Sequence, residues 1–136
     1  MEIKTFIEEI DQNITKNKPI EKECVLKLLH AIEKYNLALD NPNGFTIKRM
    51  AKENHMIECL SDTEEIERNG KFQEQLNLTI DDVRNCSKRV VERSELNQTI
   101  VSISDVWCLI TAIYAYNKAV GMPNSNVWML EILESE

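Results

Sequence analysis

The sequence has few of the residues that interrupt helices or build sheets. Its 136 residues include three glycines and three prolines, and aromatic residues make up 6% of the chain. Turns must therefore be few and short, and the β-branched alternation that marks strands is almost absent. These shortages exclude a strand-rich fold. They predict an all-α fold in one helical domain over residues 1–136.

Residues that carry chemistry are equally scarce. There are two histidines, His30 and His55, and there is no Glu-x-x-His pair, no G-x-S-x-G element and no glycine-rich phosphate loop. His55 and Cys59 share one helical face and could supply two zinc ligands, but no second pair lies nearby to complete a site. We therefore expect no metal, no cofactor and no enzymatic activity.

Paired cysteine motifs are also missing. Four cysteines lie far apart and none forms a C-x-x-C pair: Cys24, Cys59, Cys86 and Cys108. Such residues are typical of free thiols packed in a reduced core. The opening segment MEIKTFIEEIDQ has acidic residues where a signal peptide needs an apolar run, so the sequence predicts a cytoplasmic protein.

Positive charge is in deficit, because the formal net charge is −7. This balance argues against nucleic acid and against an anionic membrane surface as partners. Residues 44–56, GFTIKRMAKENHM, suggest one helix of a helix-turn-helix with three cations facing DNA: Lys48, Arg49 and Lys52. The acidic run that follows lacks a second basic helix, so DNA binding is the weaker hypothesis.

One basic stripe interrupts the acidic background. A predicted helix near residues 79–93 directs four cations outward, which form a candidate patch for an acidic partner: Arg84, Lys88, Arg89 and Arg93. The alternative interpretation is that these residues are simply the solvated side of a helix.

The most distinctive feature is residues 102–120, SISDVWCLITAIYAYNKAV, which carry no charge between Asp105 and Lys118. Ser102 and Asp105 form a capping pattern, and Gly121 follows as a stop signal. A helix that is apolar on nearly every side must be covered by other helices. It is too short to span a bilayer, which needs about 20 apolar residues. We therefore predict a central buried helix in a compact bundle.

Shorter amphipathic patterns predict the surrounding helices. The first covers residues 2–16, and the second runs from about 20 to 39, with Pro19 in its first turn and Tyr35 and Leu39 on its inner stripe. A third follows Thr46. A short acidic helix follows Ser61, a brief helical piece carries Phe72 and Leu76, and Thr79 caps the next helix. Residues 94–98 form a polar link, and Ser125 caps a last helix.

Several segments between residues 57 and 131 resemble the poxvirus Bcl-2-like family of intracellular virulence factors. The matching stretches are ECLSDTEEIE (58–67), DDVRNC (81–86), TIVSIS (99–104), the apolar helix that follows, and PNSN with WMLEIL (123–133). The family has the same order: a short acidic helix, a D-D-V-x-x-C-like helix, a buried central helix and a helix ending in M-L-E-x-L. The resemblance implies a Bcl-2-like topology. In that topology residues 2–16 are an extra N-terminal helix, which could stand in for the seventh helix that the family usually has.

The resemblance also implies a function. Members antagonise host innate immune signalling by occupying the surface of a host protein, and no N-W-G-R-like segment opens the central helix here. That departure favours the branch that binds signalling adaptors over the branch that blocks cell death. Family members often form homodimers through their first and sixth helices. Here this would use Tyr35, Trp128 and Met129 as anchors, with ordinary core packing as the alternative for each.

The expected function is therefore that of a non-enzymatic protein-binding module. A bacterial or phage acidic helical inhibitor or immunity protein fits the length and charge as well. The arrangement of helices around residues 102–120 would separate the two hypotheses, since an up-and-down bundle without a central helix contradicts the first.

Overall fold

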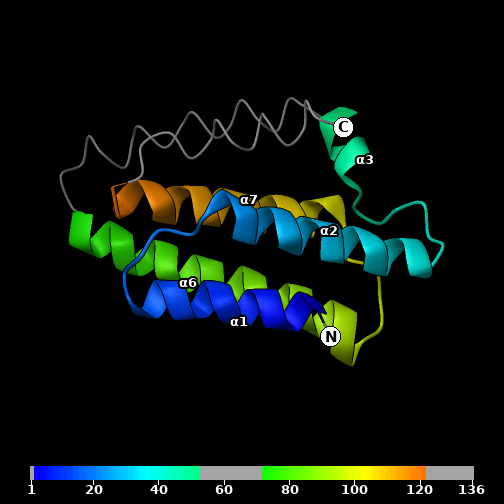
Figure 1. Ribbon diagram of the computed structural model, residues 1–136, viewed down its shortest axis with the longest axis horizontal. Coiled ribbons are helices and arrows are strands. Elements are labelled where there is room, and N and C mark those ends of the chain that lie inside the picture. The colour runs from blue at the N-terminus through cyan, green and yellow to red at the C-terminus, as the bar shows by residue number, and fades with distance from the viewer. Residues whose placement is uncertain (1, 53–71, 122–136) are drawn as a thin grey trace.

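The computed structural model describes residues 2–52 and 72–121, which fold mostly into helices (Figure 1). The helices are α1 (Glu2–Thr15), α2 (Lys22–Ala38), α3 (Ile47–Lys52), α6 (Phe72–Val91), the π-helical turn η2 (Glu92–Leu96) and α7 (Ile103–Ala119). The four long helices run along the long axis of the molecule. One isolated antiparallel bridge, between Gly44 and Ser102, is the only β-type pairing within these residues. The predicted all-α fold is confirmed.

Helix α1 forms because isoleucines recur at spacings of three and four residues. Ile3, Ile7, Ile10 and Ile14 are all buried. The helix packs along α2 and also touches α6, so the predicted N-terminal helix is an integral member of the bundle.

Helix α7 is the predicted central helix, and its boundaries are as expected. The Ser102 hydroxyl accepts from the Asp105 amide at 3.1 Å, and the Asp105 carboxylate accepts from the Ser102 amide at 3.1 Å, so a complete capping box is present. Gly121 ends the helix with φ +96°. Within Ile103–Ala119 only Ser104 and Cys108 are exposed, and α6 packs along its length. The prediction of a buried central helix is confirmed, and the Bcl-2-like topology stays a prediction.

Two expectations for α6 are wrong. Thr79 does not cap a new helix, because it lies inside the continuous helix Phe72–Val91, is buried, and donates its hydroxyl to the Leu76 carbonyl at 2.8 Å. A threonine inside a helix can satisfy its hydroxyl in this way without ending the helix. The expected polar link after Ser94 is also partly helical, because η2 extends α6 to Leu96.

Three further predictions fail at helix ends or surfaces. The first residue of α2 is Lys22, with Glu21 as N-cap, so Pro19 precedes the helix. Leu39 lies beyond the end of α2 and is 40% exposed, because the chain turns away at Asp40 with φ +50°. Cys108 is exposed on α7 rather than packed in the core.

Several other predictions lie outside the described residues. These concern the acidic helix after Ser61, the final helix with Trp128 and Met129, and the pair His55 and Cys59.

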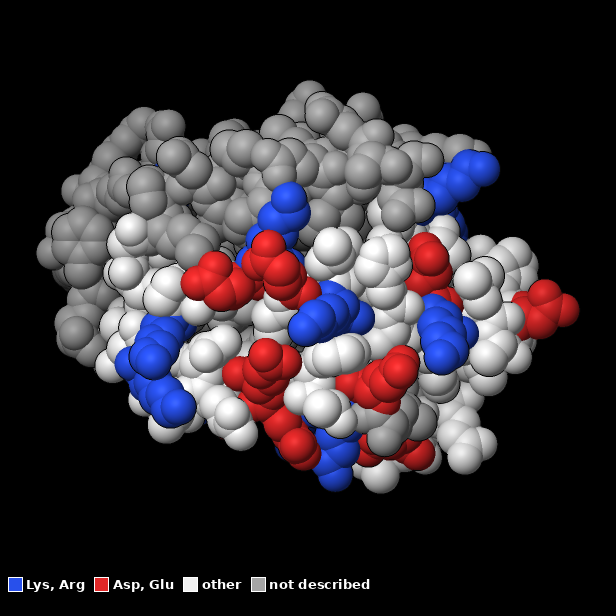
Figure 2. All heavy atoms as spheres, in the orientation of Figure 1, with Lys and Arg blue, Asp and Glu red and all other residues white. Residues whose placement is uncertain are grey.

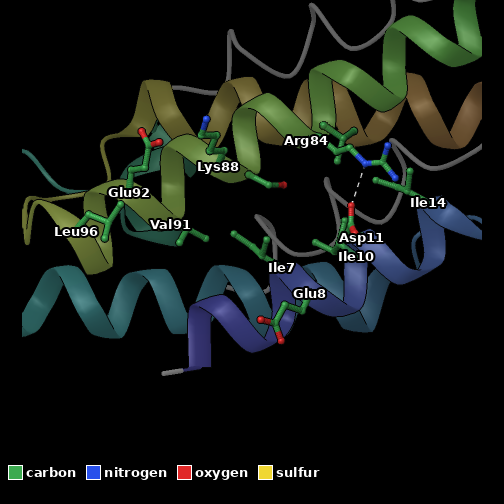
Figure 3. Close-up of a pocket in the computed structure, with 12 residues that line it drawn as sticks. Ile7, Glu8, Ile10, Asp11, Ile14, Arg84, Lys88, Val91, Glu92 and Leu96 are labelled. Carbon is green, nitrogen blue, oxygen red and sulfur yellow. Dashed lines mark hydrogen bonds and ion pairs between the residues drawn. The ribbon is translucent and has the colours of Figure 1, made fainter.

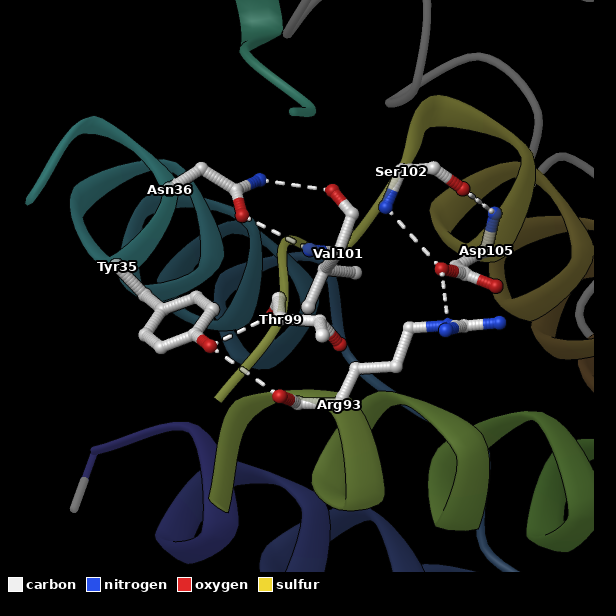
Figure 4. Close-up of polar contacts among 7 residues, drawn as sticks. All are labelled: Tyr35, Asn36, Arg93, Thr99, Val101, Ser102 and Asp105. Atoms are coloured by element: carbon white, nitrogen blue, oxygen red, sulfur yellow. Dashed lines mark hydrogen bonds and ion pairs between the residues drawn. The ribbon is translucent and has the colours of Figure 1, made fainter. Parts of the chain in front are cut away.

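Two buried amides, which we call the polar clamps, tie α2 and α7 to the links around them. Asn36 donates to the carbonyls of Phe45 (3.0 Å) and Val101 (2.8 Å) and accepts from the Val101 amide (2.9 Å). Asn117 accepts from the Ile20 amide (2.8 Å) and donates to the Ile20 carbonyl (3.0 Å). Figure 4 shows the first clamp beside the α7 capping box. Because buried backbone groups must find partners, each clamp fixes where a link meets the core.

Candidate functional site

A groove of about 430 Å³ lies between α1 and the α6–η2 segment (Figure 3). The α1 wall is lined by Ile7, Glu8, Ile10, Asp11 and Ile14. The α6–η2 wall is lined by Val83, Arg84, Ser87, Lys88, Val91, Glu92 and Leu96. Helices α1 and α6 run antiparallel and touch only lightly compared with α6 and α7. The apolar faces of the two helices are therefore not fully covered by each other.

The floor of the groove is apolar, and one buried polar atom on it lacks a hydrogen-bond partner. Its isoleucines and valines come from the inner stripes of α1 and α6. The Ser87 Oγ atom is buried there without a hydrogen-bond partner. At one end Leu96 is 75% exposed, the highest value among the large apolar residues that the structure describes. Apolar surface of this kind, bordered by polar residues, is typical of a binding site.

The rim of the groove is charged and carries both acidic and basic side chains. At one end Arg84 Nε lies 3.0 Å from Asp11 Oδ1, and Arg84 Nη2 lies 3.4 Å from the Thr15 hydroxyl. Glu8 on the α1 wall and Lys88 and Glu92 on the α6–η2 wall form no ion pair with any residue that the structure describes. The rim therefore offers charges of both signs to a partner.

The predicted basic patch stays a prediction, and the structure places its four cations in different surroundings. Arg84 is engaged by Asp11, and Lys88 and Arg89 are exposed. Arg93 turns instead toward α7, where its Nε lies 2.9 Å from Asp105 Oδ2 (Figure 4). Asp105 is 7% exposed, and a buried carboxylate needs a counter-ion. The Arg93 Nε hydrogen is not aligned for a hydrogen bond, so the contact is an ion pair only. On the face shown in Figure 2 acidic and basic side chains are likewise interspersed.

Tyr35 is half-buried, and its hydroxyl is already used within the fold. It donates to the carbonyls of Thr99 (2.6 Å) and Arg93 (3.2 Å), which joins α2 to the link before α7 (Figure 4). Burial raises the pKa of its phenol. The proposed role of Tyr35 as an interface anchor stays a prediction.

Three thiols and one histidine lie in the described part of the chain, and no two of them form a nucleophile–base pair there. Burial, with a smaller effect from Glu9, raises the pKa of the Cys24 thiol to about 11, which makes it a poor nucleophile. Cys86 and Cys108 border a shallow hollow beside Trp107, and burial followed by the proximity of Cys108 raises the pKa of Cys86. Within residues 2–52 and 72–121 no cluster of side chains could hold a metal ion. His30 is exposed on α2.

The sequence pattern located the two walls of the groove but not the groove itself. Ile7, Ile10 and Ile14 read as an ordinary core stripe, because periodicity does not reveal that a neighbouring helix leaves a stripe partly uncovered. Leu96 was the one local signal, since it is a lone leucine within a polar stretch.

None of the helices in the described part of the chain is both long enough and apolar enough to cross a membrane. Comparison of the chain with protein-family models, with curated proteins and with solved structures gives no match.

Proposed function

We propose that this chain is a non-enzymatic protein-binding module whose α1–α6 groove receives an apolar face of a partner protein. The observation that carries the proposal is the groove itself, with an apolar floor, an exposed leucine at one end and a charged rim. Protein interfaces commonly combine an apolar centre with a polar border.

A small-molecule site is a poorer description of the same groove. Such sites usually direct several polar groups toward one enclosed ligand. On the floor of this groove Ser87 is the single polar residue, and the charged groups stand at the rim. An extended apolar ligand with charges along its edges matches this distribution better.

The resemblance to poxvirus Bcl-2-like proteins supports a more specific form of the proposal. In that form the module acts in the host cytoplasm and antagonises innate immune signalling by occupying the surface of an adaptor protein. It performs no chemistry, which agrees with the absence of catalytic motifs from the sequence.

Site-specific photocrosslinking in candidate host extracts tests the proposal. A photoreactive amino acid replaces Leu96 at the groove in one variant and Leu78 in another. Leu78 also lies on the exposed side of α6, is 57% exposed and does not line the groove. We expect a defined protein adduct from position 96 that is absent from position 78. Equal adducts from both positions, or none from position 96, would refute the groove as the binding site.

A further inference from the structure

Two free cysteines from adjacent helices, Cys86 of α6 and Cys108 of α7, border the same hollow of about 270 Å³. The rest of its lining is Asp82, Trp107, Thr111, Ala112 and Ala115. None of these residues lines the α1–α6 groove, so the hollow is a separate feature of the surface. Two thiols that face one space can be joined by oxidation, which a single surface cysteine cannot achieve within one chain.

The packing of α6 on α7 suits such a bond. The two helices are antiparallel and pack along their length (Figure 1). Axes of packed helices lie about 8–10 Å apart and each Cα atom lies about 2.3 Å from its axis, so Cα atoms that face each other are roughly 4–6 Å apart. A disulfide joins Cα atoms about 4.4–6.8 Å apart. The thiols of Cys86 and Cys108 are also close enough to influence each other's ionisation.

We propose that Cys86 and Cys108 form a two-thiol redox site, which a hydroperoxide converts to a disulfide between α6 and α7. First the Cys108 thiolate attacks a peroxide oxygen, the O–O bond breaks, and Cys108 becomes a sulfenic acid as hydroxide leaves. The Cys86 thiolate then attacks the sulfenic sulfur, the S–O bond breaks, and a second hydroxide leaves as the S–S bond forms. The protons of the two thiols convert both hydroxides to water, and the peroxide accepts the two electrons.

Exposure assigns the order of the two steps. Cys108 is exposed, so the oxidant reaches it first. Cys86 is half-buried, and burial followed by the proximity of Cys108 raises the pKa of its thiol. Asp82 on α6 and Asp105 on α7 act in the same direction, whereas Arg89 opposes them. Cys86 therefore keeps its proton to higher pH and is the second thiol to react.

The hollow also contains a polar atom that the fold leaves without a partner. Thr111 Oγ1 is buried and has no hydrogen-bond partner in the described part of the chain. Thr111 follows Cys108 by three residues, which places both on the same side of α7. A sulfenic acid on Cys108 brings an oxygen to this side of the helix, and the Thr111 hydroxyl can donate to it.

The disulfide would close a loop over residues 86–108. This loop contains η2 with Leu96 at the end of the groove, and also the Arg93–Asp105 ion pair. A cross-link stabilises a protein chiefly by restricting its unfolded chain. We expect the midpoint of thermal unfolding to rise by roughly 5–10 °C on oxidation and to return when dithiothreitol is added.

Oxidation of the full chain with hydrogen peroxide, followed by peptide mapping without reductant, tests the proposal. We expect one linked pair of peptides, which contain Cys86 and Cys108, and no disulfide-linked dimer. Cys86→Ser should stop at the sulfenic acid of Cys108, which dimedone traps. Cys108→Ser should give no dimedone adduct at Cys86 under the same conditions.

A matched control and the unfolded chain separate this site from general thiol oxidation. Cys24→Ala removes a buried thiol outside the hollow and should leave the Cys86–Cys108 linkage unchanged. In urea the linkage should lose its preference over the other cysteine pairs. Oxidation of Cys108 to a sulfinic acid while Cys86 stays free would overturn the inference. Linkage of either thiol to Cys24 or Cys59 in the folded wild type, or no oxidation at all, would overturn it equally.

Discussion

Buried polar atoms have hydrogen-bond partners at the polar clamps, whereas one at the α1–α6 groove has none. At the clamps, Asn36 and Asn117 are almost fully buried and each of their amides has backbone partners at 2.8–3.0 Å. At the groove, the Ser87 hydroxyl is buried with no hydrogen-bond partner, and Lys88 and Glu92 at the rim form no ion pair within the described residues.

This difference separates the part of the molecule that holds the fold together from the part that is left available. A buried polar group with all its partners positions the chain, whereas an unsatisfied one costs stability and is retained where something else is gained. Substitutions in the two regions should therefore change the free energy of unfolding by different amounts, and even in opposite directions.

The largest effect should come from Asn36→Ala. It strands the carbonyls of Phe45 and Val101 and the amide of Val101 in the core, and each buried group left without a partner is costly. We expect the free energy of unfolding to fall by about 2–4 kcal/mol in urea titrations. The neighbouring Leu37→Ala, at a position 64% exposed, is the control and should be nearly neutral. A loss no larger than that of the control would show that the clamp does not hold the fold.

A smaller effect at the same clamp is expected from Gly44→Ala. The added Cβ would lie 2.9 Å from both Cβ and Cγ of Asn36, closer than real contacts allow. We expect a loss of about 1–3 kcal/mol on thermal or urea unfolding. In the Asn36→Ala background the clash with Cγ is gone, so the penalty should shrink. An identical penalty in both backgrounds would mean that the Asn36 side chain beyond its Cβ is not what limits residue 44.

Alkaline pH should destabilise the buried core through Cys24. The unfolded thiol ionises near pH 9.0, but the folded thiol holds its proton until about pH 11 because burial disfavours the thiolate. Its contribution is complete below pH 9.0 and is lost as the pH rises toward 11, because there the unfolded state releases the proton first. Tyr35 and Tyr116 act in the same direction, since burial raises both pKa values.

Urea titrations across this pH range, on the wild type and on Cys24→Ala, measure the effect. We expect the variant to lose less stability between pH 9.0 and 11. If both proteins lost the same amount, the other groups whose pKa burial raises, Cys86 and the tyrosines, would account for the dependence.

The smallest effect is expected at the groove, from Ser87→Ala. Because the hydroxyl has no partner to lose, its removal should change the free energy of unfolding by less than about 0.5 kcal/mol or increase it. Loss of more than about 1 kcal/mol in the same urea assay would show that the hydroxyl is bonded and that the contrast with the clamps is false.

Prediction from sequence worked best where local pattern and burial coincide. The isoleucine spacing of α1 and the Ser102–Asp105 capping box specified helices that the structure contains. Prediction from sequence was less complete where a residue type is compatible with two different local environments. Thr79 fits a cap as well as a helix interior, and only its place within the continuous α6 helix decides between them. For Arg93 the sequence does not show the ion pair with the buried Asp105, because the two residues belong to different helices.

For the candidate site, the sequence by itself determined the apolar stripes of α1 and α6, the uncharged middle of α7 and the acidic balance of the surface. These follow from residue types and helical spacing, because each is a property of one segment. Only the tertiary structure decided that α1 and α6 leave a groove between them, that Asp11 and Arg84 set its register, and that Asn36 and Asn117 bind links distant in sequence. The physical reason is that hydrogen-bond partners and uncovered surface belong to pairs of segments, and such pairs exist only once the chain has folded.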